Sequence, residues 1–198
     1  MKYINQLDYP NLTYVTMTEM EGVAKETGKN TTIANSGCGL CSAVMVINKL
    51  LPKSTFGLED AINLSYKVKA NILAGTQYYI YAPALAKEYG LKYQATKSTK
   101  ELLNCLRTGG VAVARVAGDR EGYVGVFSHG RHYITIVGEE PDGKLAILDP
   151  SLKKDKFLIE GRLGKVEIKN DVVVVCDVNV LKEDCLPHDP CYFLFWRG

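Results

Sequence analysis

The sequence of 198 residues lacks the features that would assign it to a membrane or to nucleic acid. Its apolar stretches, such as residues 43–47, are far shorter than the roughly twenty residues that a membrane-spanning helix needs. The formal net charge is only +2 and no basic run is present, so nothing indicates a nucleic-acid partner. The N-terminus lacks the apolar core of a signal peptide. Two expectations stay open: a cytoplasmic chain, or a secreted chain whose signal peptide has been removed.

Repeats, low-complexity segments and credible linkers are also absent, so we expect a single domain over residues 1–198. Apolar residues make up 46% and charged residues 23%, the balance of an ordinary globular protein. A chain of this length buries roughly 70% of its unfolded surface and needs no covalent staples. Its six cysteines are therefore not interpreted as a disulfide scaffold. Cys105 and Cys176 lie in apolar helix and strand patterns, and we expect them to be packing residues.

The first part of the chain predicts helices and the second part predicts mainly strands. Residues 1–35, rich in Thr, Asn and Tyr, predict extended segments and loops. Helical patterns cover residues 38–51, 58–68, 78–89 and 99–107. Short β-branched or aromatic runs, typical of an antiparallel sheet, cover residues 91–95, 111–117, 132–138, 144–149, 156–160, 165–169, 172–178 and 191–196. Helices followed by strands indicate an α+β protein.

Cys38 begins the most apolar of these helices. A helix that is apolar on every face is a buried one, and Ser36 is a suitable N-cap residue for it. A thiolate in the first helical turn faces unpaired backbone N–H groups and the positive end of the helix dipole, and both lower its pKa. The position therefore suits a nucleophile. The alternative is that Cys38 merely begins a core helix.

A hairpin in the second half brings a histidine to an aspartate. The runs HYITIVG and KLAILD are joined by EEPDG, and a turn centred between Glu140 and Pro141 would place His132 directly opposite Asp149. Cβ atoms at such cross-strand positions are about 5 Å apart. That separation allows a carboxylate to bond one imidazole nitrogen while the other faces outward.

These segments resemble a known family. SGCGLCSAVMV, GGVAVARV, SHGRHYITIVG and AILDPS occur in the order found in papain-like bacterial cysteine peptidases, specifically the bacteriocin-processing (double-glycine leader) peptidases and their stand-alone relatives. The resemblance covers about three-quarters of the chain. It implies a papain-like fold in which a helical half, led by the Cys38 helix, packs on an antiparallel sheet carrying His132 and Asp149. It also implies a Cys38–His132–Asp149 triad and no cofactor or metal.

The sequence departs from this family at two points. Papain-like enzymes carry a Gln shortly before the nucleophile as an oxyanion donor, often six residues upstream, and position 32 here is Thr. Gln6 is the candidate for this role, with residues 7–35 as an excursion before Cys38. Cys41 replaces a residue that is usually small or hydroxylated. CGLC is thus also a Cys-x-x-Cys motif, which leaves open thiol oxidoreductase chemistry or a regulatory Cys38–Cys41 disulfide.

Cys185, His188 and Cys191 have ligand chemistry at close spacing, but a structural zinc needs four ligands and a fourth is not evident. The two prolines of this segment favour a loop instead. His129 is expected to lie in the loop that leads to His132 and to line the cleft rather than to catalyse.

The function we expect is hydrolysis of a peptide or amide bond by a Cys38 thiolate. His132 would act as the base, Asp149 would orient it, and Gln6 would stabilise the oxyanion. The expected partner is a peptide or amide substrate, with no nucleic acid and no membrane span. The alternative from another class is a binding protein on a peptidase fold that has lost turnover.

Overall fold

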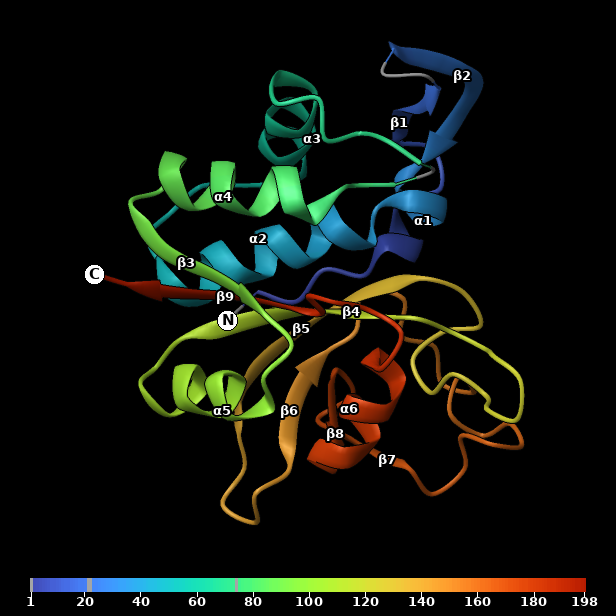
Figure 1. Cartoon of the computed structure of the whole chain (residues 1–198), viewed down its shortest axis with the longest axis vertical. Coiled ribbons are helices and arrows are strands. Elements are labelled where there is room, and N and C mark those ends of the chain that lie inside the picture. The colour runs from blue at the N-terminus through green and yellow to red at the C-terminus, as the bar shows by residue number, and fades with distance from the viewer. Residues whose placement is uncertain (1, 21–22, 74) are drawn as a thin grey trace.

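The computed structural model describes residues 2–20, 23–73 and 75–198. The larger of the two sheets in these residues has seven antiparallel strands in the order β3-β9-β4-β5-β6-β8-β7 (Figure 1). These strands are β3 (Leu91–Thr96), β4 (Val111–Val116), β5 (His132–Glu139), β6 (Leu145–Leu148), β7 (Val166–Lys169), β8 (Val173–Cys176) and β9 (Tyr192–Arg197). The predicted α+β class with an antiparallel sheet is thus confirmed.

Helices cover both faces of this sheet. They are η1 (Gln6–Asp8), α1 (Ile33–Ser36), α2 (Cys38–Leu50), α3 (Leu58–Lys67), α4 (Tyr78–Glu88), α5 (Thr99–Arg107) and α6 (Val178–Cys185). Figure 1 shows α2, α3 and α4 on one face, and α5 and α6 on the other. Strand β4 alternates between the two cores: Val111 and Val113 pack toward α2, whereas Ala112 and Ala114 pack toward α5.

The predicted buried helix is α2. Ten of its thirteen residues are buried, as its apolar sequence requires. Its N-cap is Gly37 rather than the expected Ser36, which ends α1. A glycine is needed there because a Cβ atom at residue 37 would lie 2.5 Å from the carbonyl oxygen of Ile33. The close passage from α1 to α2 therefore fixes where α2, and with it Cys38, begins.

Aromatic packing ties α2 to the sheet. The Tyr78 hydroxyl, at the start of α4, donates to the carbonyl of Gly39 at 2.8 Å. The Tyr78 ring stacks on the Tyr133 ring of β5, with centroids 4.6 Å apart. The first turn of α2 and the first residues of β5 are thereby held against one buried side chain.

Two segments differ from the expectation. Residues 156–160 form no strand but belong to a series of turns: Phe157 is buried, while Leu158 is 66% exposed. Residues 158–160 are all exposed, so burial does not alternate along this segment as it does in a strand with one buried face. Helix α6 was not predicted. Its N-cap is Asp177, which we had included in the strand of residues 172–178.

The N-terminal region contains more regular structure than expected. Strands β1 (Thr13–Met20) and β2 (Val23–Thr32) form a separate antiparallel pair with an irregularity between Val15 and Met17. Figure 1 shows this pair beside α1, apart from the main sheet. The segment predicted as an excursion between Gln6 and Cys38 thus consists mainly of this pair and α1.

Candidate active site

Cys38 is the first residue of α2 and is partly exposed. Burial by itself raises the pKa of this thiol, but a hydrogen bond and positive charge from His132, together with the backbone N–H groups of Tyr133 and Gly39, lower it below the usual value. The thiolate is therefore stabilised by both elements that meet here, the N-terminus of α2 and the start of β5.

His132 is the first residue of β5 and is 5% exposed. Its Nε2 atom lies 2.8 Å from Oδ1 of Asp149, which leaves Nδ1 for the contact with Cys38. Burial lowers the pKa of this imidazole, but the Asp149 carboxylate and the Cys38 thiolate outweigh it, so the pKa of His132 is raised. A lowered thiol pKa beside a raised imidazole pKa favours a thiolate–imidazolium pair.

The hairpin that carries His132 and Asp149 has a different register from the predicted one. Thr135 pairs with Leu148, whereas the predicted register would pair it with Ala146. A shift of two residues leaves each side chain on its original face, because side chains alternate with a period of two. His132 and Asp149 are therefore diagonal rather than opposite neighbours, and their side chains still meet.

Asp149 directly follows β6 and is fully buried. It has further partners besides His132. Its carboxylate accepts a hydrogen bond from the Ser151 backbone N–H at 2.9 Å and forms an ion pair with Lys156. Burial would raise the pKa of this carboxyl, but Lys156 and His132 hold it well below its usual range. Burial lowers the pKa of Lys156, against the attraction of Asp149. The aspartate is thus ionised and fixed in position.

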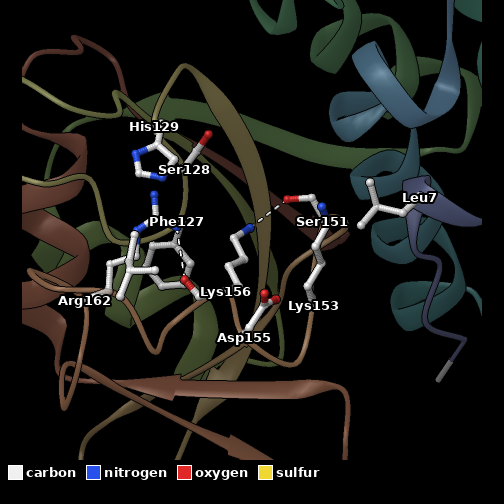
Figure 2. Close-up of a pocket in the computed structure, with 10 residues that line it drawn as sticks. Leu7, Phe127, Ser128, His129, Ser151, Lys153, Asp155, Lys156 and Arg162 are labelled. Atoms are coloured by element: carbon white, nitrogen blue, oxygen red, sulfur yellow. Dashed lines mark hydrogen bonds between the residues drawn. The ribbon is translucent and has the colours of Figure 1, made fainter.

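Sequence reasoning missed Lys156 and Ser151. The Lys156 ammonium also donates to the Ser151 hydroxyl at 2.7 Å (Figure 2). That hydroxyl lies 3.1 Å from Nε2 of His132. Nothing in the sequence distinguishes Lys156 from the nearby Lys153 and Lys154. The only available signal for Ser151 was its place directly after the Asp-Pro pair.

Gln6 lies between α1 and the segment that follows Asp149. Its side-chain Nε2 donates to the Ala34 carbonyl at 2.7 Å, and its backbone N–H donates to the Pro150 carbonyl at 2.6 Å. The residue is 6% exposed, and its Oε1 has no hydrogen-bond partner among the described residues. An amide has two N–H donors, so one remains after the bond to Ala34.

Two hollows adjoin these residues. A groove of about 100 Å³ opens beside Cys38 and is lined by Asn35, Ser36, Cys38, Ile72, Leu73, Gly75, Thr76, Gln77, Arg115, Arg131 and Tyr133. A cavity of about 310 Å³ lies on the Ser151 and Lys156 side (Figure 2) and is lined by Leu7, Phe127, Ser128, His129, Ser151, Lys153, Asp155, Lys156, Ile159 and Arg162. His129 was expected to line the cleft, and it lines this second cavity beside the site.

Comparison with solved structures identifies a similar fold. A crystal structure from Bacillus anthracis, described as a C39-like peptidase, matches with a TM-score of 0.50 and 15% sequence identity, over 82% of this chain and 89% of that one. The fold is similar to that of a C39-like peptidase. No protein-family model and no curated protein matches the sequence. The expected resemblance to cysteine peptidases is thus confirmed for the fold, and the bacteriocin-processing type stays a prediction.

The remaining cysteines are free thiols in the interior. Cys41 is fully buried in α2, and burial followed by the charge of Cys38 raises its pKa. Cys185 ends α6 and Cys191 directly precedes β9, and burial followed by the neighbouring Cys191 thiol raises the pKa of Cys185. Across the described residues, no group of three His, Cys, Asp or Glu side chains is arranged to hold a metal ion. Nor is any helix in that part of the chain long and apolar enough to cross a membrane.

Proposed function

We propose that the chain is a cysteine-dependent hydrolase of peptide or amide bonds. Cys38 is the nucleophile, His132 the general base and acid, and Asp149 the residue that orients His132. The observation that carries this proposal is the hydrogen bond between Asp149 and His132 together with the mutual effect of His132 and Cys38 on their pKa values, which links the β5–β6 hairpin to the start of α2. The likeness to a C39-like peptidase supports it at the level of the fold.

In the proposed reaction the Cys38 thiolate attacks the substrate carbonyl and forms a tetrahedral intermediate. His132 then gives its Nδ1 proton to the leaving amine, and a thioester remains on Cys38. A water molecule loses a proton to His132 and attacks the thioester, which releases the acid and restores the thiolate–imidazolium pair. Asp149 keeps Nε2 bonded throughout, so Nδ1 stays directed at the reacting atoms.

The oxyanion of the intermediate needs hydrogen-bond donors. The backbone N–H of Cys38 belongs to the first turn of α2, where N–H groups have no helical partner. The second donor would be the remaining amide hydrogen of Gln6. A single donor of this kind is typically worth about 3 kcal/mol of barrier.

The test combines thiol labelling with substrate screening. Iodoacetamide should alkylate Cys38 rapidly near neutral pH, and mass spectrometry of the digested protein identifies the labelled residue. The same protein is then screened against a fluorogenic peptide library that includes double-glycine leaders and amide-linked cell-wall fragments, with Cys38→Ala as control. Rapid labelling with cleavage that Cys38→Ala abolishes supports the proposal.

Two other outcomes contradict it. Labelling of Cys38 at the rate of an ordinary thiol would mean that His132 does not activate it. Rapid labelling without cleavage of any substrate in the screen would favour the alternative, a binding protein on a peptidase fold.

A further inference from the structure

The groove beside Cys38 has an uncompensated positive charge. Two arginines, Arg115 and Arg131, are among its lining residues, and no aspartate or glutamate is. Two other arginines do form ion pairs: Arg107 binds Glu139 and Arg120 binds Glu183. Within the described residues, neither groove arginine has a carboxylate within ion-pair distance.

The sheet explains how both guanidinium groups reach the groove. Arg115 of β4 pairs with Tyr133 of β5, so their side chains share a face. Arg131 precedes Tyr133 by two residues and projects to that same face. The Tyr79 hydroxyl accepts a hydrogen bond from Arg115 at 3.1 Å, which holds this guanidinium at the start of α4.

His188 lies close enough to Arg115 and Arg131 for their charges to act on it. The pKa of His188 is lowered to about 4, first by burial and then by the charges of Arg115 and Arg131. This histidine is therefore neutral at pH 7 and adds no charge to the groove. It also offers no negative charge that would neutralise the two arginines.

The groove lies on the acyl side of the proposed reaction. His132 must give its proton to the leaving amine, so the leaving half of the substrate lies on the His132 side. The groove contains Cys38 in its lining but not His132, and thus takes the half of the substrate that becomes the thioester.

We infer that the enzyme selects substrates with a carboxylate side chain on the acyl side of the scissile bond, bound by Arg115 and Arg131. This inference rests on the proposed function and names its substrate class. Guanidinium groups bind carboxylates through paired, charge-assisted hydrogen bonds. Partly exposed pairs of this kind change rates by roughly two- to fivefold each.

The first test needs no peptide substrate. The same thiolate displaces iodide from iodoacetate and from iodoacetamide, but only iodoacetate carries a carboxylate. The ratio of the two rates therefore cancels any change in the thiolate fraction. We expect the iodoacetate/iodoacetamide ratio at Cys38 to fall roughly two- to fivefold in Arg115→Gln and in Arg131→Gln, and further in the double variant. Lys100→Gln, in α5 on the other face of the sheet, should leave the ratio unchanged. An unchanged ratio in the double variant overturns the inference.

The second test uses matched substrates. A peptide cleaved in the library screen is made with Glu, Gln or Lys at the acyl-side position, and kcat/KM is compared. The Glu/Gln ratio should exceed one in the native protein, and Arg131→Glu should reverse the preference toward Lys. Equal kcat/KM for the Glu and Gln peptides overturns the acidic preference while the proposed hydrolase stands. If no peptide is cleaved although Cys38 labels rapidly, the proposed function is wrong and this inference with it.

Discussion

Three ionisable side chains meet in the interior at the candidate site. Asp149 is fully buried, His132 is 5% exposed, and the Lys156 side chain is 8% exposed. Buried charges are tolerated only when they are paired and hydrogen-bonded, so each of these groups depends on the others. Lys156 acts on this group in two ways: it fixes Asp149 through an ion pair, and its positive charge lowers the pKa of His132.

Lys156→Gln separates these two effects. The loss of the ammonium loosens Asp149, so we expect kcat/KM to fall roughly five- to tenfold, which corresponds to about 1 kcal/mol of barrier. Loss of its positive charge raises the pKa of His132 further, so the imidazolium persists to higher pH. The basic limb of the kcat/KM profile should therefore move upward in pH.

The control for this variant is Lys153→Gln, an exposed lysine of the same segment. A purely structural role for Lys156 would lower activity without moving the basic limb. If the basic limb of the Lys156→Gln profile does not move although the variant has a native circular dichroism spectrum, Lys156 does not act as a positioning residue.

Residues of the candidate site could be predicted from the sequence only where they lie in a recognisable local pattern. A helix start marked Cys38, and the hairpin marked His132 and Asp149. Lys156 lies close to two other lysines in a segment whose turns could not be predicted from the sequence. Its contact with Asp149 could therefore not be predicted either. The register error has two sources. The turn is centred near Asp142, where the Glu140 N–H bonds to the Lys144 carbonyl, and an irregularity between Ile136 and Gly138 then changes the pairing by one residue.

Cys41 leads to a prediction about oxidation. Cys41 follows Cys38 by three residues in α2, and side chains three residues apart on a helix are neighbours. Mild peroxide would oxidise the Cys38 thiolate to a sulfenic acid, and the Cys41 thiol would condense with it to a disulfide and release water. We expect activity to be lost and then restored by dithiothreitol. In Cys41→Ala, turnover should persist, and the same dose of peroxide should cause a loss that dithiothreitol does not fully reverse.

Peptide mapping checks this assignment directly. A Cys38–Cys41 disulfide should appear in the oxidised native protein. If Cys41→Ala is as inactive as Cys38→Ala although folded, the motif performs redox chemistry and the roles assigned here are wrong.

At the scale of elements, the loop before β5 depends on α6. Asp184 of α6 is fully buried and accepts hydrogen bonds from the Tyr123 hydroxyl and from the backbone N–H groups of Val126 and Phe127. This loop leads into β5, so α6 orders the approach to His132. A buried donor that loses its acceptor costs about 1–3 kcal/mol.

Asp184→Ala should therefore lower the free energy of unfolding by about 3 kcal/mol or more. Asp177→Ala, which removes only the exposed N-cap of the same helix, should cost about 1 kcal/mol. Urea denaturation followed by tryptophan fluorescence and circular dichroism measures both. Equal effects of the two substitutions would show that the Asp184 contacts do not stabilise the loop.

Elements with a strong periodic pattern were predictable from the sequence, and those defined by tertiary contacts were not. Helix α2 was expected at residues 38–51 and spans Cys38–Leu50, because it is buried on all sides. Helix α6 is short, and its stability comes from Asp184, whose partners lie about sixty residues earlier in the sequence. The turns around Lys156 depend in the same way on contacts with Asp149 and Ser151.

At the scale of the whole molecule, the site forms where the N-terminus, α2 and the hairpin meet. The Tyr3 hydroxyl donates to the carbonyl of Asp149 at 2.7 Å, and Gln6 bonds to Pro150 and Ala34. The N-terminal segment thus holds α1 and the end of β6 together. The relative placement of Cys38 and His132 follows from this tertiary arrangement, which no local sequence pattern determines.

The pH dependence of the site tests this arrangement as a unit. The thiolate forms as the pH rises through the lowered pKa of Cys38, and the imidazolium is lost as it rises through the raised pKa of His132. We expect a bell-shaped kcat/KM profile between these two limits. Cys38 alkylation should begin at lower pH than for an ordinary thiol. In His132→Ala the alkylation curve should move to higher pH, because burial remains while the stabilising imidazolium is gone.

Asp149 requires a more careful variant than alanine, because Asp149→Ala would leave Lys156 buried without a partner. Asp149→Asn combined with Lys156→Met removes both charges together and keeps the packing volume similar. Asp149 affects the pKa of His132 more strongly than Lys156 does, so the loss of both charges lowers that pKa. The basic limb should therefore move downward, opposite to the shift expected for Lys156→Gln alone. We expect kcat/KM to fall by roughly one to two orders of magnitude, less than in Cys38→Ala, because the helix dipole and oxyanion donors still act. A folded double variant with native kinetics and an unmoved basic limb would reduce Asp149 to a structural residue, and a Cys38–His132 dyad would then suffice for the chemistry.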